Sequence, residues 1–462
     1  MKNIFVKTLG CKVNTFDSHA LENQFRKNGY QVVEHVSAAD VAVINTCSVT
    51  AVAEKEARYL LRRYKRENPA SFRVVTGCYA QIDSGSIAQM PEVDFIVPNE
   101  VKERLVNLVE ERWQARSDGI DPGSKLPDGI ASVRDNKQKH FKSALTLFDN
   151  PRSNRARAFL KIQDGCNGFC SYCQIPYARG ESRSVPVQQV LQQAKRLSQE
   201  GVAELVLTGI HIGDYGEDFG SEGREQKIFL QLLEDLFHLE GLKRVRISSL
   251  EPAELTLGLI QVLAKNRDKF CDHFHLPLQS GSDKILKKMN RKYTCARYLE
   301  SVRMIRDFFP QAQISADVIP GFPGEGEQDF QETIDFIKQC QLASLHVFPY
   351  SKRPNTAAMR FPDHLDARII KERAEALRSL SKIQQRHFCQ KNFLQKTEVL
   401  WEVFDREKLR WFGKTKNYLP IVSSSNYQTE IGNIEPISVK GYFDDTYLLG
   451  AKLSESLSDD HS

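Results

Sequence analysis

Two stretches of the chain alternate between short strand-like segments and helical segments, and this alternation restricts the possible folds more than any other feature. In residues 1–113 the strand-like segments are short, rich in β-branched residues and bounded by polar residues. They lie at residues 4–10, 41–47, 72–78 and 94–99. Helical patterns separate them, including residues 15–28 and 53–67. Strands joined by helices pair in parallel, so we expect an α/β fold with an N-terminal doubly wound parallel sheet.

The second alternation begins at residue 158 and contains six further strand-like segments. Their sequences are AFLKIQ, AELVLTG, RVRISS, HFHLPLQ, QISADVIPG and SLHVFPY. Helical patterns lie between them, for example at residues 187–199 and 328–339. Six such units predict a partial TIM-like βα barrel, whose active site lies at the carboxyl ends of the strands.

The remaining segments differ in composition. Residues 114–157 are rich in Gly, Pro, Asp and Lys, which is typical of a linker or a long loop, and their basic second half fits either a solvated linker or an RNA contact. Residues 366–396 look like a long basic helix, and the four alternating segments after it predict a small β-barrel. The expected organisation is a domain at 1–113, a linker at 114–157, a barrel at 158–394 and a small β-barrel at 395–455.

Charge and hydropathy exclude some classes of protein. The chain of 462 residues carries 64 Lys and Arg against 59 Asp and Glu, and its net charge of +5 is too small to indicate a nucleic-acid partner by itself. No run reaches the ~18 consecutive apolar residues that a membrane-spanning helix needs. The start, MKNIFVKTLG, lacks the features of a signal peptide. We therefore expect a cytoplasmic protein without a membrane partner.

Three of the ten cysteines are crowded together, and in a reducing cytoplasm such spacing indicates metal ligation or catalysis rather than disulfides. Cys166, Cys170 and Cys173 follow the first strand of the predicted barrel, where active-site loops belong. Thiolates are ligands of both iron–sulfur clusters and zinc. Three thiolates on a four-iron cube leave one iron open, as in reactive metal sites. No second Cys or His pair lies nearby to complete a zinc tetrahedron, which favours an iron–sulfur cluster.

Three other cysteines are far apart in the sequence but share one kind of position. Cys11, Cys47 and Cys78 each stand at the carboxyl end of a predicted strand. These ends lie along one edge of a parallel sheet, so the three thiols can meet there. Gly10 and Gly77 permit the close backbone approach that a bulky ligand needs. The spacing alone leaves open that they are simply three buried cysteines.

The crowded cysteines carry a family resemblance. The segment Cys166-Asn-Gly-Phe-Cys170-Ser-Tyr-Cys173 resembles the C-x-x-x-C-x-aromatic-C signature of radical S-adenosylmethionine (radical SAM) enzymes. The resemblance implies a [4Fe-4S] cluster whose open iron binds SAM. It also implies a one-electron reductant such as flavodoxin or ferredoxin, and cleavage of SAM to a 5′-deoxyadenosyl radical. The aromatic residue before the third cysteine, here Tyr172, lies against the adenine in that family; ordinary packing is the alternative.

The spread cysteines extend the resemblance to one branch of that family, the methylthiotransferases. The segments TLGCKVNTFDS, INTCSVT and TGCYAQ resemble the amino-terminal domain of that branch, and QDGCNGFCSYCQIPYARGESRS and DVIPGFPGE resemble its barrel. The resemblance implies that Cys11, Cys47 and Cys78 ligate a second [4Fe-4S] cluster. It further implies that this second cluster holds and delivers sulfur, which a second SAM methylates, while the first generates the radical.

Other strand ends supply candidates for holding SAM. Thr208 and Gly209 stand where the broader family often has a Gly-Gly-Glu turn, although this chain has Thr-Gly-Ile. Ser249, Gln279 and Asp317 also end strands and are candidates for ribose or carboxylate contacts. Arg291 is a candidate partner for the SAM carboxylate. For each of these residues, ordinary surface or turn polarity is the alternative.

The C-terminal module interleaves basic and aromatic residues, a pattern that suits phosphate contact and base stacking. WFGKTKNYLPIV and LLGAKL resemble the TRAM domain, a small RNA-binding β-barrel. An ordinary basic face of the barrel is the alternative. The candidate RNA-binding residues are Arg410, Trp411, Phe412, Lys414, Lys416 and Tyr418.

The resemblance also implies a substrate. GCKVN followed by TFDS resembles the branch that methylthiolates C2 of N6-threonylcarbamoyladenosine at position 37, in the anticodon loop of tRNA. The alternatives among enzymes are isopentenyl-adenosine in tRNA and an aspartate of a ribosomal protein. The non-enzyme alternative is an iron–sulfur protein that binds RNA or senses redox state.

Overall fold

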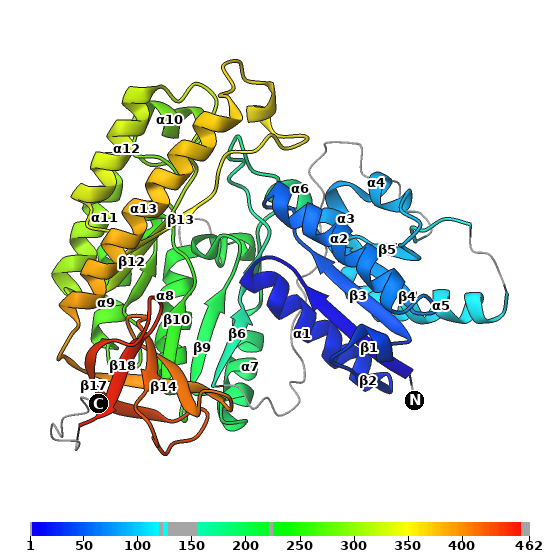
Figure 1. Ribbon diagram of the computed structural model, residues 1–462, viewed down its shortest axis with the longest axis horizontal. Coiled ribbons are helices and arrows are strands. Elements are labelled where there is room, and N and C mark those ends of the chain that lie inside the picture. Colours follow the sequence, from blue (N-terminus) through cyan, green and yellow to red (C-terminus); the bar gives the residue numbers. More distant parts are fainter. Residues whose placement is uncertain (1, 120–122, 128–155, 221–224, 454–462) are drawn as a thin grey trace.

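The structure is a computed structural model, and it describes residues 2–119, 123–127, 156–220 and 225–453. Most of the predicted linker, including its basic half, lies outside the described residues. Figure 1 shows three parts in chain order, which are a parallel sheet with helices, a larger arc of strands and helices, and a small barrel. No helix among the described residues is long and apolar enough to cross a membrane.

The N-terminal part is the expected parallel α/β sheet, with strand order β2-β1-β3-β4-β5. Every residue of β3 and β4 is buried, as expected where helices cover both faces. The expected strands are all present, and the structure adds the short edge strand β2, whose three residues give little sequence signal. The elements are β1 (Lys2–Thr8), α1 (Lys12–Lys27), β2 (Tyr30–Val32), β3 (Val41–Thr46), α2 (Ala51–Glu67), β4 (Phe72–Gly77), α3 (Cys78–Ile82), α4 (Ser84–Ala88), β5 (Phe95–Val97) and α5 (Leu105–Ser117).

The central part contains all six expected strands as two parallel sheets, β10-β9-β6 and β11-β12-β13. A bridge between Val245 and Phe270 joins the sheets into one arc, so the partial barrel is confirmed. The small antiparallel pair β7–β8 lies beside the cysteine loop. The elements are β6 (Arg157–Lys161), β7 (Gln163–Asp164), α6 (Ile175–Arg179), β8 (Arg183–Ser184), α7 (Val187–Gln199), β9 (Glu204–Thr208), α8 (Glu225–His238), β10 (Arg244–Ile247), α9 (Leu257–Lys265), β11 (His273–His275), α10 (Asp283–Lys288), α11 (Cys295–Phe308), β12 (Gln313–Val318), α12 (Glu327–Gln339) and β13 (Ser344–Val347).

The C-terminal part is a closed five-stranded barrel of strand order β14-β15-β16-β18-β17, which agrees with a TRAM-like module. The long helix α13 (Ala367–Lys391) leads into it, and Asp366 caps the start of that helix. The second of the four predicted segments folds as two strands, because the chain reverses near Tyr418 with a left-handed φ of 67°. The strands are β14 (Lys396–Asp405), β15 (Arg410–Thr415), β16 (Pro420–Ser423), β17 (Ile434–Tyr442) and β18 (Leu448–Lys452).

The C-terminal barrel packs against the end of the central arc at which β6, β9 and β10 begin (Figure 1). Two buried arginines of β10 make this contact. Arg244 donates to the carbonyl of Glu398 at 3.2 Å, and Arg246 donates to the carbonyl of Lys416 at 2.8 Å. Arg246 also pairs with buried Glu204 at 2.8 Å. The opposite ends of the strands, where ligands bind in βα barrels, are left free of this module.

Candidate active site

The loop that carries Cys166, Cys170 and Cys173 runs between β7 and α6, and its backbone turns toward the thiols. The amide of Gly168 donates to Cys166 Sγ at 3.3 Å, and the amide of Ile175 donates to Cys173 Sγ at 3.4 Å. Burial raises the pKa of Cys173, and the neighbouring thiols raise it further. Since metal ligation deprotonates thiols outright, this loop suits a cationic centre.

Arg291 places a positive charge beside the same loop. Its Nη1 donates to Cys170 Sγ at 3.2 Å, and its Nη2 is paired with Glu251. Its Nε donates to the Tyr293 hydroxyl at 3.3 Å. The sequence pattern made Arg291 a candidate for the SAM carboxylate, and the structure places it against a cysteine of the first trio.

The structure brings Cys11, Cys47 and Cys78 to one edge of the N-terminal sheet, after the neighbouring strands β1, β3 and β4. A Cβ at Gly10 would lie 2.6 Å from Cys47 Sγ, so the backbone beside Cys11 passes directly over the second thiol. Burial raises the pKa of Cys47 to about 12, and both Cys78 and Cys11 contribute to the rise. Cys47 and Cys78 are buried and Cys11 is exposed, so the three thiols meet where the buried edge of the sheet opens to the surface.

The spacing of both trios differs from that of a single-ion site. Zinc ligands at about 2.3 Å from the ion bring sulfur atoms within roughly 4 Å of one another. Among the described residues, His211, Asp214 and Glu254 form a group of three potential metal ligands whose ligand atoms all lie within 4.8 Å of one another. Neither cysteine trio forms so tight a group. Neither trio is therefore arranged as a preformed single-ion zinc site.

A cavity of about 180 Å³ lies where the two large parts of the chain meet. Cys173 and Tyr172 border it on the side of the barrel, and residues 48–50, directly after Cys47, border it on the side of the N-terminal sheet. Residues 348–351 and Arg353, after β13, complete the lining together with other strand ends. One chamber is therefore lined by a cysteine of the first trio and by the loop that follows a cysteine of the second.

The segment after β13 bonds to both cysteine loops. Arg353 donates to the Ser48 carbonyl at 2.6 Å and pairs with Glu54 on α2 at 3.2 Å. The carbonyl of Pro354 accepts from Gln174, the residue after Cys173, at 2.7 Å. This segment therefore fixes the two loops relative to each other.

The structure separates the SAM candidates into two groups. Tyr172, Gln279 and Asp317 line the cavity. The other strand-end candidates, Thr208, Gly209 and Ser249, are not among the described residues that line it. The turn after β9 is instead held by Gln163 Oε1, which accepts from the amides of residues 210 and 211 at 2.9 and 2.8 Å.

His211 follows that turn and lies 3.8 Å from Cys166 Sγ through its Nδ1. The same nitrogen lies 3.1 Å from Asp214, and Nε2 is paired with Glu254. Burial lowers the pKa of His211, but the hydrogen bonds to Asp214, Cys166 and Glu254 raise it by more. The resulting imidazolium adds a second positive charge beside the first trio.

Comparisons with known proteins cover nearly the whole chain. The sequence model of the Radical SAM superfamily matches residues 160–337, and that of Uncharacterized protein family UPF0004 matches residues 3–98. The protein described as threonylcarbamoyladenosine tRNA methylthiotransferase MtaB of Aquifex aeolicus is 39% identical over 90% of this chain and 95% of its own. The protein of the same description from Bacillus subtilis is 37% identical over 95% and 94%. This chain belongs to the radical SAM methylthiotransferase family.

More distant relatives agree with this membership. A tRNA-2-methylthio-N(6)-dimethylallyladenosine synthase of Bartonella tribocorum is 33% identical over 95% of this chain and 94% of its own. Among solved structures, the radical SAM methyltransferase TsrM of Kitasatospora setae has a TM-score of 0.57 at 14% identity, covering 78% of this chain and 77% of its own. The radical SAM enzyme OxsB has a TM-score of 0.51 at 13% identity, covering 85% and 56%. The solved structures share the fold.

The candidate RNA-binding residues of this methylthiotransferase point in different directions. Tyr418 stacks on His273 with ring centroids 4.7 Å apart, and Lys416 Nζ donates to the carbonyl of Arg267 at 3.2 Å, so both face the central arc. Phe412 is buried, and Lys414 lies 3.6 Å from Glu402. The remaining two, Arg410 and Trp411, are partly exposed on β15.

Sequence reasoning missed two parts of this site. The segment around Arg353 was not a candidate, because a lone arginine in a loop carries no pattern. A group of buried charged residues behind Cys78 was also missed, although QDGC and IPYARG contain two of its members, Asp164 and Arg179. The signal was a lysine and an aspartate, Lys161 and Asp164, placed three residues apart beside an otherwise apolar strand.

Proposed function

We propose that this methylthiotransferase modifies tRNA, replacing the C2 hydrogen of N6-threonylcarbamoyladenosine at position 37 by a methylthio group. The observation that carries the proposal is a cavity lined by Cys173 of the first trio and by residues 48–50, directly after Cys47 of the second. The MtaB proteins that match almost the full chain support the tRNA substrate and the modified nucleoside. We expect the reaction to take place in the cytoplasm, with flavodoxin or ferredoxin as the reductant.

The chemistry demands cofactors of the kind that these thiols would hold. The C2–H bond of an adenine has no acidity that a side-chain base can use near neutral pH, so acid–base catalysis alone is insufficient. A [4Fe-4S] cluster with SAM at Cys166, Cys170 and Cys173 supplies a 5′-deoxyadenosyl radical, and a second [4Fe-4S] cluster at Cys11, Cys47 and Cys78 supplies sulfur that a second SAM methylates.

The side chains around the cavity have roles that follow from their positions. Tyr172, Gln279 and Asp317 are the candidates for holding SAM, because they line the cavity next to Cys173. Arg291 stabilises the thiolate of Cys170 by donating to its sulfur.

The target base must leave the stack to enter this chamber. An adenine beside the anticodon lies in a single-stranded loop, so unstacking costs only a few kcal/mol. The partly exposed Arg410, Trp411 and Lys414 of the TRAM-like barrel are candidates for holding the tRNA backbone and bases; Arg410 also donates to the Ser423 carbonyl at 2.6 Å.

Mass spectrometry of tRNA nucleosides from cells that lack this protein tests the substrate. We expect loss of 2-methylthio-N6-threonylcarbamoyladenosine and its unmethylthiolated precursor in its place. Loss of the methylthio group from isopentenyl-adenosine instead would support the other tRNA branch. Unchanged tRNA with an unmodified ribosomal-protein aspartate would support the protein-modifying branch, and no change in either would support the non-enzyme alternative.

Two single-cysteine variants test the division of labour between the trios. Cys170→Ala should abolish cleavage of SAM to 5′-deoxyadenosine. Cys47→Ala should retain cleavage but form no methylthiolated tRNA, because the first trio stays intact. Methylthiolation by the Cys47→Ala protein would refute the role given to the second trio.

A further inference from the structure

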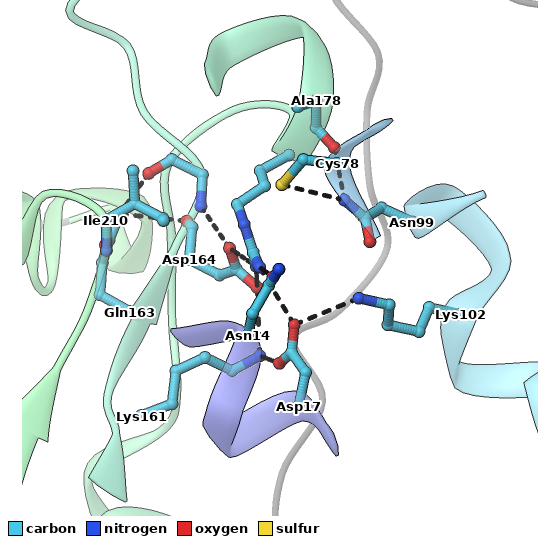
Figure 2. A network of polar contacts seen from close by, with 12 residues as sticks. Asn14, Asp17, Cys78, Asn99, Lys102, Lys161, Gln163, Asp164, Ala178 and Ile210 are labelled. Carbon is cyan, nitrogen blue, oxygen red and sulfur yellow. Dashed lines mark hydrogen bonds and ion pairs between the residues drawn. The ribbon is translucent and has the colours of Figure 1, made fainter. Parts of the chain in front are cut away.

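Five charged side chains are buried together where the N-terminal sheet meets the central arc (Figure 2). Each is at most 4% exposed. They come from α1, the 3-10 helix Asn99–Arg104, β6, β7 and α6. We name this group the interdomain charge cluster, and its members are Asp17, Lys102, Lys161, Asp164 and Arg179.

Ion pairs connect all five members. Asp17 accepts from Lys161 at 2.6 Å, from Arg179 at 3.2 Å and from Lys102 at 3.4 Å. Asp164 accepts from Arg179 at 2.9 Å and from Lys161 at 3.1 Å. Figure 2 shows these contacts converging from both parts of the chain. Arg179 and Lys161 therefore each bridge both carboxylates.

Each carboxylate of the cluster is held by at least two buried basic side chains. Arg183, which is 14% exposed, adds a further contact to Asp164 at 3.4 Å. Two carboxylates therefore face four basic side chains, so positive charge is in excess.

A partner for this charge lies beside Arg179. The α3 helix begins at Cys78 and packs against α6, which ends at Arg179. Asn99 Nδ2 donates to the carbonyl of Ala178, the residue before Arg179, at 2.8 Å and lies 3.8 Å from the Cys78 sulfur, and Ala178 packs against Cys78. Within the described part of the chain, Nε of Arg179 has no hydrogen-bond partner although it is buried.

The charge of the proposed second iron–sulfur site fits this surplus. Buried charges are costly unless they are paired. An oxidised [4Fe-4S] core carries two positive charges, so three thiolate ligands give the site a net charge of minus one. A site loaded at Cys11, Cys47 and Cys78 would offset part of the excess positive charge of the interdomain charge cluster and Arg183.

We propose that Arg179 is a positioning residue for the second iron–sulfur site: it holds one positive charge of the interdomain charge cluster beside the Cys78 ligand and thereby stabilises the reduced form of the bound group. The inference rests on the proposed function, because it requires a cluster at the second trio. Reduction adds a negative charge to the site, and a fixed buried cation next to a ligand thiolate favours that added charge.

The test uses the full chain in which Cys166, Cys170 and Cys173 are all replaced by alanine, so that only the second site can load. After anaerobic reconstitution with iron and sulfide, the iron content and an EPR-monitored redox titration are measured. Arg179→Gln should shift the reduction equilibrium at least tenfold toward the oxidised form, which is about 59 mV for one electron. Arg179→Lys, which keeps the charge, should shift it less than about threefold.

A matched control removes another buried arginine that is not near the thiols. Arg373 on α13 pairs with Glu325 at 2.7 Å and with Glu327 at 3.0 Å. Arg373→Gln should leave the potential of the second site unchanged. An equal shift in this control would show a general effect of lost stability and overturn the inference.

The outcomes separate the inference from the proposed function. If the protein with the three alanine replacements and an unchanged Arg179 (the parent) binds no iron, the second cluster is refuted, and the inference with it. A parent with about four irons whose potential is the same in Arg179→Gln would overturn the inference alone. If Arg179→Gln loads no iron while Arg179→Lys loads fully, the positive charge is required at the site and the inference stands.

Discussion

Glu204 offers a direct measure of how the C-terminal barrel is attached to the central arc. Its carboxylate is 1% exposed and pairs with Arg246 at 2.8 Å, and Arg246 in turn donates to carbonyls of the TRAM-like barrel. Burial raises the pKa of Glu204, yet the pairing with Arg246 and Arg157 lowers it to about 2 from 4.5. Replacing Glu204 by glutamine keeps the shape and removes the charge.

The pKa shift sets the expected magnitude. Each pKa unit corresponds to about 1.4 kcal/mol, so a fall of about 2.5 units means that ionised Glu204 contributes about 3 kcal/mol to folding at neutral pH. Removing one partner of a buried ion pair generally costs about 3–5 kcal/mol, which agrees. We therefore expect Glu204→Gln to lower the free energy of unfolding by about 3 kcal/mol.

Urea unfolding at pH 7, followed by circular dichroism, measures this loss. Glu67→Gln is the control, because Glu67 pairs with Arg63 at the surface of α2, where both side chains are well exposed, and should cost less than about 1 kcal/mol. A loss below about 1 kcal/mol in Glu204→Gln would refute the argument.

The pH dependence provides a second check. The folded pKa of Glu204 is depressed, so its contribution is complete above about pH 4.5 and is lost as the pH falls from there toward 2. The difference in stability between the natural chain and Glu204→Gln should therefore shrink across this window. A difference that stays constant down to pH 2 would show that the pair does not cause the stability.

Three further variants probe the site and its supports. Gly10→Ala should roughly halve the iron bound after reconstitution, because the added Cβ would lie 2.6 Å from Cys47 Sγ and Gly10 has a φ of 96°; full loading would contradict this. Tyr418→Ala should speed proteolysis at the C-terminal barrel at least several-fold, because the Tyr418 ring stacks on His273 and helps to hold the barrel against the central arc. An unchanged rate of proteolysis would contradict this expectation. Arg353→Ala should reduce methylthiolation at least tenfold and leave SAM cleavage intact, because Arg353 donates a hydrogen bond that holds the Ser48 carbonyl in place. Equal losses of both activities would contradict this expectation.

The fold followed from the sequence because both of its large parts repeat one physical pattern. The buried strands β3 and β4 are continuous apolar runs, and such runs between amphipathic helices are recognisable without contacts. The errors fell on short elements. The strand β2 is only three residues long, and the turn at Tyr418 divides a segment that looked like one strand because its φ of 67° has no clear signal in a tyrosine.

The positions of Cys11, Cys47 and Cys78 could be predicted because the carboxyl ends of parallel strands lie along one edge of the sheet. The place of each cysteine in the strand pattern therefore indicated its place in the fold. The interdomain charge cluster could not be placed in this way. Its residues lie on five separate elements, and each of them, such as Lys102, resembles an ordinary surface residue in the sequence. Likewise, the interleaved basic and aromatic residues of β15 fit an RNA-binding face, but the sequence does not distinguish Arg410, which is partly exposed, from Tyr418, which stacks inward.

Charged residues join the N-terminal sheet to the central arc at positions where apolar residues would serve stability, and their contacts explain this choice. Buried ion pairs can often be replaced by well-packed apolar side chains without loss of stability, so stability alone does not account for Asp17, Arg179 and Arg353. Ion pairs with short, directed bonds instead fix orientation, whereas apolar surfaces tolerate small shifts. The chamber needs this property because its two thiol trios belong to different parts of the chain. Replacing Arg353 and Glu54 together by apolar residues should therefore preserve stability better than it preserves coupling between the two trios.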